Sequence, residues 1–247
     1  MSPSILGSWQ GLNLSTPYLK ILANWSLITT PNIMKIKIKI LPTSYPQGSE
    51  LQLIAKVTGK KIKKGELPIN KGVVVSNVST IKSTYDAFTN GIPLVERIVT
   101  ISGENLSKIG NYIIKIGTPL EHIIKTLKPN ENSKIIFGGP MMGQEIFDNS
   151  TATIKGTSGI LFLKNEGEIE RNNCISCGYC VEVCPMNLMP LEFAEFYEKN
   201  EYKMIAKANI MSCIECGACE YACPSRVPLI ESIKNGKETL IRMEGNK

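Results

Sequence analysis

Residues 174–185 read CISCGYCVEVCP, and this stretch decides the fold of the C-terminal part because it holds four of the chain's eight cysteines. Residues 213–224 read CIECGACEYACP and repeat it position for position. Both runs follow the pattern C-x₂-C-x₂-C-x₃-C-P, which is typical of bacterial proteins that hold two [4Fe–4S] clusters. The repeat therefore predicts an α-helical, ferredoxin-like dicluster module.

The cysteine spacing predicts which thiolates share a cluster. Three cysteines with two residues between neighbours can bind three iron corners of one cluster. The fourth cysteine lies beyond this loop and reaches the other cluster. Gly178 and Gly217 let the backbone bend close to the sulfurs. The first predicted ligand set is Cys174, Cys177, Cys180 and Cys223, and the second is Cys213, Cys216, Cys219 and Cys184.

Other uses of the cysteines are weaker interpretations. Disulfides need an oxidising compartment, and the N-terminus shows no secretory-signal pattern. Two Cys₄ zinc sites are arithmetically possible, but zinc ribbons space their cysteine pairs farther apart. The single histidine, His122, shares a predicted helix with Lys125 and Lys128, so we expect it at the surface. We expect no catalytic residue, since every thiol is assigned to a cluster.

Residues 35–95 read as a partial Rossmann-like α/β segment. Residues 36–40 alternate Ile and Lys, which predicts a half-buried strand. The Gly48-Ser49-Glu50 stretch opens an apolar helix, with Ser49 and Gln52 fitting a capping box. Residues 72–76 form a short apolar run that predicts a strand, and the polar stretch 77–80 then leads into another helix. Both helix starts fit plain capping or phosphate binding.

Residues 96–150 predict a small β-grasp-like unit. Residues 97–102 and 111–116 read as strands, and residues 118–127 read as a helix with an apolar stripe. Residues 134–137 read as a further strand, which runs into the glycine-rich stretch 138–143, expected to be a tight turn. The order strand, strand, helix, strand supports this unit.

The remaining stretches complete an α+β chain. We expect an irregular N-terminus over residues 1–34, a linker over 151–170, the ferredoxin-like domain over 171–235 and a tail over 236–247. No run of 18 apolar residues occurs, so no transmembrane helix is expected. The formal charge is +6, and two bound clusters would lower it to about +2. We therefore expect no nucleic-acid partner.

Six stretches carry a resemblance to a known family. Residues 45–50, 72–80, 138–143 and 155–160, together with 184–190 and 223–228, occur in the same order as in the C subunit of the Rnf ion-translocating electron-transport complex. That protein is similar to the flavin-carrying subunit of respiratory complex I, and residues 97–127 resemble the soluble-ligand-binding β-grasp domain of that lineage.

The resemblance implies a role in an ion-translocating NADH:ferredoxin-type oxidoreductase, a translocase. The chain would relay electrons from NADH through its clusters towards membrane subunits that move sodium ions or protons. It would sit peripherally on the cytoplasmic face of the bacterial inner membrane. Its expected partners are the membrane and membrane-associated subunits of the same complex and redox donor or acceptor proteins.

The resemblance also implies FMN for the family, with one departure in this chain. Family members carry a glycine-rich flavin loop, and residues 1–35 contain no G-x-G-G-x-G stretch, as in a truncated copy. One side of a flavin site would be formed by Gly48, Ser49, Glu50, Asn77 and Thr80. Without the loop we expect a cluster relay rather than direct NADH oxidation. The alternatives are a non-catalytic iron–sulfur remnant and a soluble dicluster component of another oxidoreductase.

Overall fold

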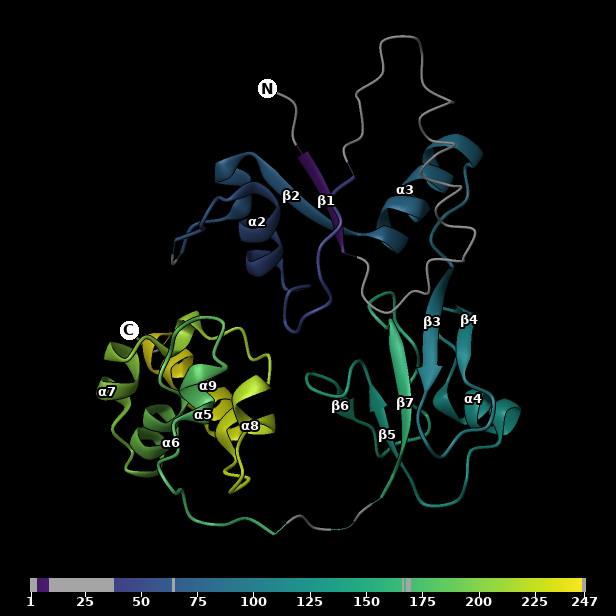
Figure 1. Ribbon diagram of the computed structural model, residues 1–247. Coiled ribbons are helices and arrows are strands. Elements are labelled where there is room, and N and C mark those ends of the chain that lie inside the picture. The colour runs from purple at the N-terminus through teal and green to yellow at the C-terminus, as the bar shows by residue number, and fades with distance from the viewer. Residues whose placement is uncertain (1–3, 9–37, 64, 166, 168–169, 246–247) are drawn as a thin grey trace. The chain divides into compact units, whose positions relative to one another are not determined.

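The computed structural model describes residues 4–8, 38–63, 65–165, 167 and 170–245 (Figure 1). The chain divides into two compact units, Met1–Ile81 and Lys82–Lys247. Each unit has its own secondary structure, and the second one contains both a β-sheet and the cysteine runs.

The first unit is built around a pair of parallel strands. Strand β1 (Ser4–Ser8) pairs with β2 (Val73–Asn77) in a two-stranded sheet. Helix α2 (Glu50–Thr58) and the 3₁₀ helix η1 (Pro68–Lys71) precede β2. We expected residues 1–34 to be irregular, whereas residues 4–8 form a strand; the rest of that stretch lies outside the described residues. Its partner strand is far away in the sequence, so local pattern does not predict the pairing.

The strand expected over residues 36–40 is not found in its described part, residues 38–40. Ile38 and Ile40 are 77% and 92% exposed. The ammonium group of Lys39 donates to the carbonyls of Lys56 and Val57, at 2.8 and 3.1 Å. These carbonyls belong to the last turn of α2. Carbonyls there have no partner within the helix, and a cation can bond to them and interact favourably with the helix dipole. An alternating pattern needs a neighbouring strand, and here the lysine caps a helix instead.

The strand and the helix predicted within residues 72–90 are confirmed, but residues 78–80, expected as a turn before the helix, already form its first turn. Helix α3 (Val78–Asn90) follows β2 directly, and the Asn77 side-chain oxygen accepts the Ser79 backbone N–H at 2.9 Å. Gly91, with φ of 65°, follows the last helical residue. The polar stretch thus starts the helix.

A five-stranded mixed sheet forms the β part of the second unit, in the order β4-β3-β7-β5-β6. Its strands are β3 (Glu96–Ser102), β4 (Gly110–Lys115), β5 (Ser133–Phe137), β6 (Gln144–Glu145) and β7 (Gly159–Lys164). Only β3 and β7 pair in parallel; the pairs β3–β4, β5–β7 and β5–β6 are antiparallel. The predicted tight turn over residues 138–143 joins β5 to β6 and is closed by a Gly143 N–H bond to the Gly139 carbonyl at 2.8 Å.

Helix α4 (Leu120–Leu127) packs on this sheet. Leu120, Ile123 and Leu127 are buried against strand residues that include Val99 and Phe162. The apolar stripe that predicted this helix is therefore its core-facing side. Pro119 occupies the N-cap position, so the helix begins at Leu120, two residues after the predicted start.

Strand β7 differs from the expected linker over residues 151–170. Ile160 and Phe162 are fully buried, and β7 lies between β3 and β5 in the middle of the sheet. The sequence signal is a short continuous apolar run, Ile160 to Leu163, of the kind that fills strands covered on both faces.

The cysteine runs lie among short helices: α5 (Tyr179–Glu182), α6 (Pro190–Glu198), α7 (Tyr202–Lys207), η2 (Ile210–Ser212), α8 (Ala218–Tyr221) and α9 (Leu229–Gly245). A small apolar core that includes Phe193, Ile205 and Ile233 joins α6, α7 and α9. The tail expected from residue 236 is instead the second half of α9. Within the described residues, no helix has both the length and the apolar character that crossing a bilayer requires.

Candidate iron–sulfur centres

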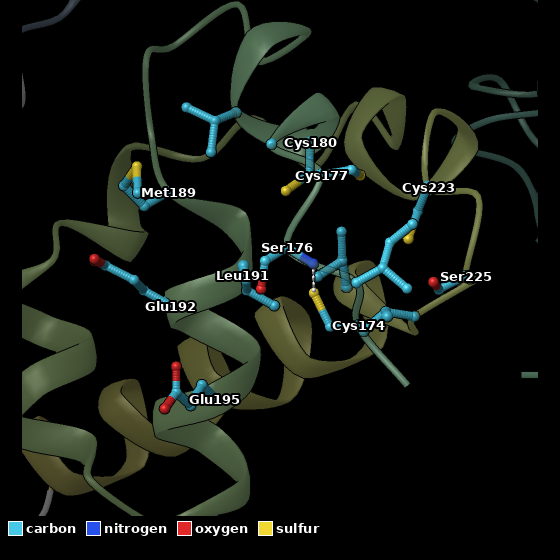
Figure 2. Close-up of a pocket in the computed structure, with 15 residues that line it drawn as sticks. Cys174, Ser176, Cys177, Cys180, Met189, Leu191, Glu192, Glu195, Cys223 and Ser225 are labelled. Carbon is cyan, nitrogen blue, oxygen red and sulfur yellow. Dashed lines mark hydrogen bonds between the residues drawn. The ribbon is translucent and has the colours of Figure 1, made fainter. Parts of the chain in front are cut away.

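Four cysteines line a cavity of about 310 Å³ (Figure 2). Cys174, Cys177 and Cys180 come from the first run, and Cys223 comes from the end of the second. These are the four members of the first predicted ligand set. The structure thus brings together cysteines from both repeats, as the crossed spacing predicts.

The backbone of the first loop turns N–H groups towards sulfur. Ser176 adopts a left-handed conformation with φ of 55°, and its N–H donates to the Cys174 sulfur at 3.3 Å (Figure 2). Gly178, with φ of 82°, then starts α5, which carries Cys180. Such N–H donors stabilise thiolate ligands and help to set the potential of a cluster.

The walls of this cavity are mostly apolar, with two carboxylates at one side. Apolar side chains come from the cysteine loop, from α6 and from the start of α9; they include Leu191, Val227 and Leu229. Glu192 and Glu195 of α6 complete the lining. Cys174 and Cys177 are exposed, so this centre lies open to solvent on one side.

The second set of cysteines lies deeper in the protein. Cys216 and Cys219 are buried, and Cys213 and Cys184 are half-buried. Burial raises the pKa of Cys219 to about 12, and the nearby thiols of Cys213, Cys216 and Cys184 act in the same direction. The thiols that influence the pKa of Cys219 are thus the other three members of the second predicted set, and Cys184 among them comes from the first run. A thiol with such a pKa is protonated at neutral pH, so iron binding must displace its proton.

The second loop repeats the geometry of the first. The Glu215 N–H donates to the Cys213 sulfur at 3.3 Å, and Glu215 has a φ of 53°. The Leu188 N–H donates to the Cys184 sulfur, also at 3.3 Å. Burial likewise raises the pKa of Cys213 and of Cys180, the latter with a further contribution from Cys223.

The arrangement favours a cluster over a single metal ion. Zinc needs four thiolate sulfurs at about 2.3 Å from one point. The four thiols around a cavity of about 310 Å³ instead suit a larger inorganic core. The residues of the first set therefore fit a [4Fe–4S] cluster.

The predicted flavin residues lie at two helix starts in the first unit. Gly48 and Ser49 precede α2, which begins at Glu50; Asn77 ends β2, and Thr80 is in the first turn of α3. Ser49 occupies the N-cap position but its side chain makes no capping bond, contrary to the expected capping box.

Two further residues lie outside the predicted ligand sets. His122 is exposed on α4, which confirms the surface position expected for it. Lys237 was missed: it reaches the Cys213 backbone from α9, a region expected to be a tail. The spacing of Leu229, Ile233 and Leu240 indicates that α9 continues past residue 236.

Two family models match the chain. The model of the 4Fe-4S dicluster domain matches residues 173–227, and that of the Nuo51 FMN-binding domain matches residues 17–86. The first match covers all eight cysteines and confirms the predicted dicluster module. The second supplies FMN as a cofactor of the family, on the segment that holds all five predicted flavin residues.

Three curated relatives illustrate the match, and each is the C subunit of an ion-translocating complex. The chain is 42% identical, over 221 residues, to the C subunit of the Na⁺-translocating ferredoxin:NAD⁺ oxidoreductase complex of Acetobacterium woodii, a match that covers 87% of this chain and 50% of the relative. It is 39% identical, over 215 residues, to the C subunit of the ion-translocating oxidoreductase complex of Rhodobacter capsulatus, covering 85% of this chain and 41% of the relative. The chain belongs to the C-subunit family of ion-translocating oxidoreductase complexes.

Membership of the C-subunit family confirms the resemblance seen in the sequence. Another relative, from Clostridium ljungdahlii, is the C subunit of a proton-translocating ferredoxin:NAD⁺ oxidoreductase complex; it is 40% identical over 173 residues, which are 68% of this chain and 38% of the relative. The chain spans half or less of the length of these relatives.

Proposed function

We propose that this chain is an electron-transfer subunit of an Rnf-type, ion-translocating NADH:ferredoxin-type oxidoreductase. The observation that carries the proposal is that Cys174, Cys177 and Cys180 of one repeat and Cys223 of the other line one cavity. Bound [4Fe–4S] clusters supply one-electron transfer. The chain's own residues hold them, shield them and donate N–H groups to the ligating sulfurs.

The ligands of the first cluster would be Cys174, Cys177, Cys180 and Cys223, and those of the second Cys213, Cys216, Cys219 and Cys184. The shared cavity of the first set and the mutual electrostatic influence of the second set support this assignment. Crossed ligation would fix the two clusters side by side and connect both halves of the module.

The N-terminal part of the proposal concerns flavin. Gly48, Ser49, Glu50, Asn77 and Thr80 would line one side of an FMN site, on helix starts whose N–H groups suit a phosphate. The match to the Nuo51 FMN-binding domain supports this assignment. On this proposal, residues 35–95 are a partial Rossmann-like domain and residues 96–150 a β-grasp-like ligand-binding domain.

The proposed partners are the membrane and membrane-associated subunits of the same complex, together with redox donor or acceptor proteins. We place the chain peripherally, on the cytoplasmic face of the bacterial inner membrane. The names of the relatives support membership of a multi-subunit, ion-translocating complex.

Anaerobic purification followed by assays of iron, sulfide and flavin tests the proposal. We expect about eight irons and about eight sulfides per chain, the content of two cubane clusters. Bound flavin would assign direct NADH oxidation to this chain, whereas clusters without flavin would assign a relay. A colourless, zinc-containing protein would overturn the proposal.

Reduction and binding assays separate a relay from a remnant. A relay accepts electrons from a low-potential donor and is retained by the membrane subunits in a pull-down. A chain that holds clusters but fails both assays would be a non-catalytic remnant. A chain that is reduced but ignores those subunits would be a component of another oxidoreductase.

A further inference from the structure

Lys237 of α9 contacts the loop that holds the second set of cysteines. Its ammonium group donates to the Cys213 carbonyl oxygen at 2.6 Å and to a Glu215 carboxylate oxygen at 2.6 Å. The Lys237 side chain is only 13% exposed and that of Glu215 is 32% exposed. The lysine is thus fixed by two charge-assisted bonds next to the first cysteine of the second loop.

The first loop has no counterpart of this ion pair. Ser176 occupies the position that Glu215 has in the second repeat. The carboxylates near the first cavity belong to α6, where Glu195 pairs with Lys199 at 2.6 Å. That pair is about half exposed, at 51% and 56%, so water and salt screen it far more than the pair around Lys237. The two halves of a repeated module therefore differ in their local charge.

We propose that Lys237 is a tuning residue of the second centre, which holds the Cys213 loop in place and keeps the reduction potential of the second cluster high. The inference rests on the proposed function and deepens it. Reduction adds negative charge to a cluster whose ligands Cys216 and Cys219 are buried, and burial opposes that change. The Lys237 ammonium would offset this cost and neutralise the Glu215 carboxylate.

Lys237 acts on a one-electron exchange in which one cluster is reduced as the other is oxidised, with no bond made and no proton moved. Loss of its charge would leave the Glu215 carboxylate unpaired beside the second centre. We expect removal of one poorly screened charge beside the Cys213 loop to change such an equilibrium by roughly tenfold, which is about 59 mV for one electron.

The test is a redox titration of both clusters in the 247-residue chain under anaerobic conditions, monitored by electron paramagnetic resonance. Lys237→Met should lower the midpoint potential of the second cluster and leave that of the first unchanged. Glu215→Gln should raise the same midpoint, and the double variant should return close to the wild-type value. Lys237→Arg should retain most of the wild-type potential.

Lys199→Met is the control, because it removes a carboxylate-paired lysine at the C-terminal end of α6 and should not move the second midpoint. If the Lys237→Met variant loses the second cluster, the Glu215→Gln variant still tests the inference, because its second midpoint potential should rise. Intact clusters with unchanged midpoints in both variants would overturn the role of Lys237 while leaving the proposed function. Absence of iron from the wild-type chain would overturn the proposed function itself.

Discussion

At the scale of single residues, backbone conformation shapes the two cysteine loops. Ser176 and Glu215 have φ of 55° and 53°, and Gly178 and Gly217 follow with φ of 82° and 77°. A left-handed conformation costs a non-glycine residue about 1–2 kcal/mol. In return, the N–H of Ser176 and that of Glu215 each reach a cysteine sulfur at 3.3 Å. The cost is offset most fully when that sulfur is a thiolate, because charged acceptors form stronger hydrogen bonds.

Cys184→Ser tests the crossed ligand sets. We expect it to disturb the second cluster and to spare the first, because Cys184 lies among the second set of thiols. Iron content should fall from about eight towards about four per chain, as one cubane is lost. Cys223→Ser is the matched control and should disturb the first cluster. Spectra in which Cys184→Ser removes only the first cluster would contradict the assignment.

Gly103→Ala tests a close backbone approach beside β3. Gly103 has φ of 128°, and a Cβ placed there would lie 2.1 Å from the Phe162 carbonyl oxygen. We expect a loss of unfolding free energy of about 3 kcal/mol from strain and overlap together. Gly117→Ala is the control, since Gly117 has φ of 92° but no atom within 4 Å of its added Cβ. Hydrogen exchange of the sheet amides measures both, and equal effects would refute the close-approach explanation.

At the scale of elements, β7 organises the sheet. It pairs in parallel with β3 on one side and antiparallel with β5 on the other. Its Phe162 is fully buried within the same core as α4. A strand in this position joins two antiparallel pairs into one sheet, so it contributes more to stability than an edge strand of equal length.

Phe162→Ala measures this contribution. Emptying a fully buried phenylalanine site should lower the unfolding free energy by about 3–5 kcal/mol. The same substitution at Phe147, which is 87% exposed, should change it by less than about 0.5 kcal/mol. Scanning calorimetry of both variants measures the two losses of unfolding free energy. Equal losses would contradict a central role of Phe162 in the core.

Local periodicity explains which elements could be predicted. Helix α4 was predicted to within two residues because its apolar positions follow the helical repeat. Strand β7 was missed although its short apolar run resembles the run that predicted β2, because only the folded sheet shows that this segment pairs with β3 and β5. The pairing of β1 with β2 joins distant parts of the sequence, which no local pattern specifies.

The candidate centres were predictable for a similar reason. Cysteine spacing within each run was enough to group Cys174, Cys177, Cys180 and Cys223, which line one cavity in the structure. The second set of four stays a prediction. The contact of Lys237 with Cys213 spans 24 positions. Nothing distinguishes this lysine from its many neighbours in the sequence, so only the folded chain reveals it.

At the scale of the whole molecule, iron and the cysteine module are expected to depend on each other. The apolar core of this module is small, and its α5 and α8 helices are only four residues long. Removal of iron by a chelator should therefore unfold most of residues 171–235, whereas the sheet keeps its own core. Hydrogen exchange read by mass spectrometry checks both parts in one experiment. Unchanged protection across α5 to α9 after iron removal would contradict this dependence.

The central place of β7 also bears on how such a chain can be rearranged by recombination. A breakpoint before residue 159 would carry β7 away with the cysteines and leave β3 and β5 with unpaired edges, which invite pairing with foreign chains. The Asn172 N–H bonds to the Ser225 carbonyl oxygen at 2.9 Å, so Asn172 already contacts the cysteine module. A breakpoint after Lys164, the last residue of β7, would instead leave all five strands together.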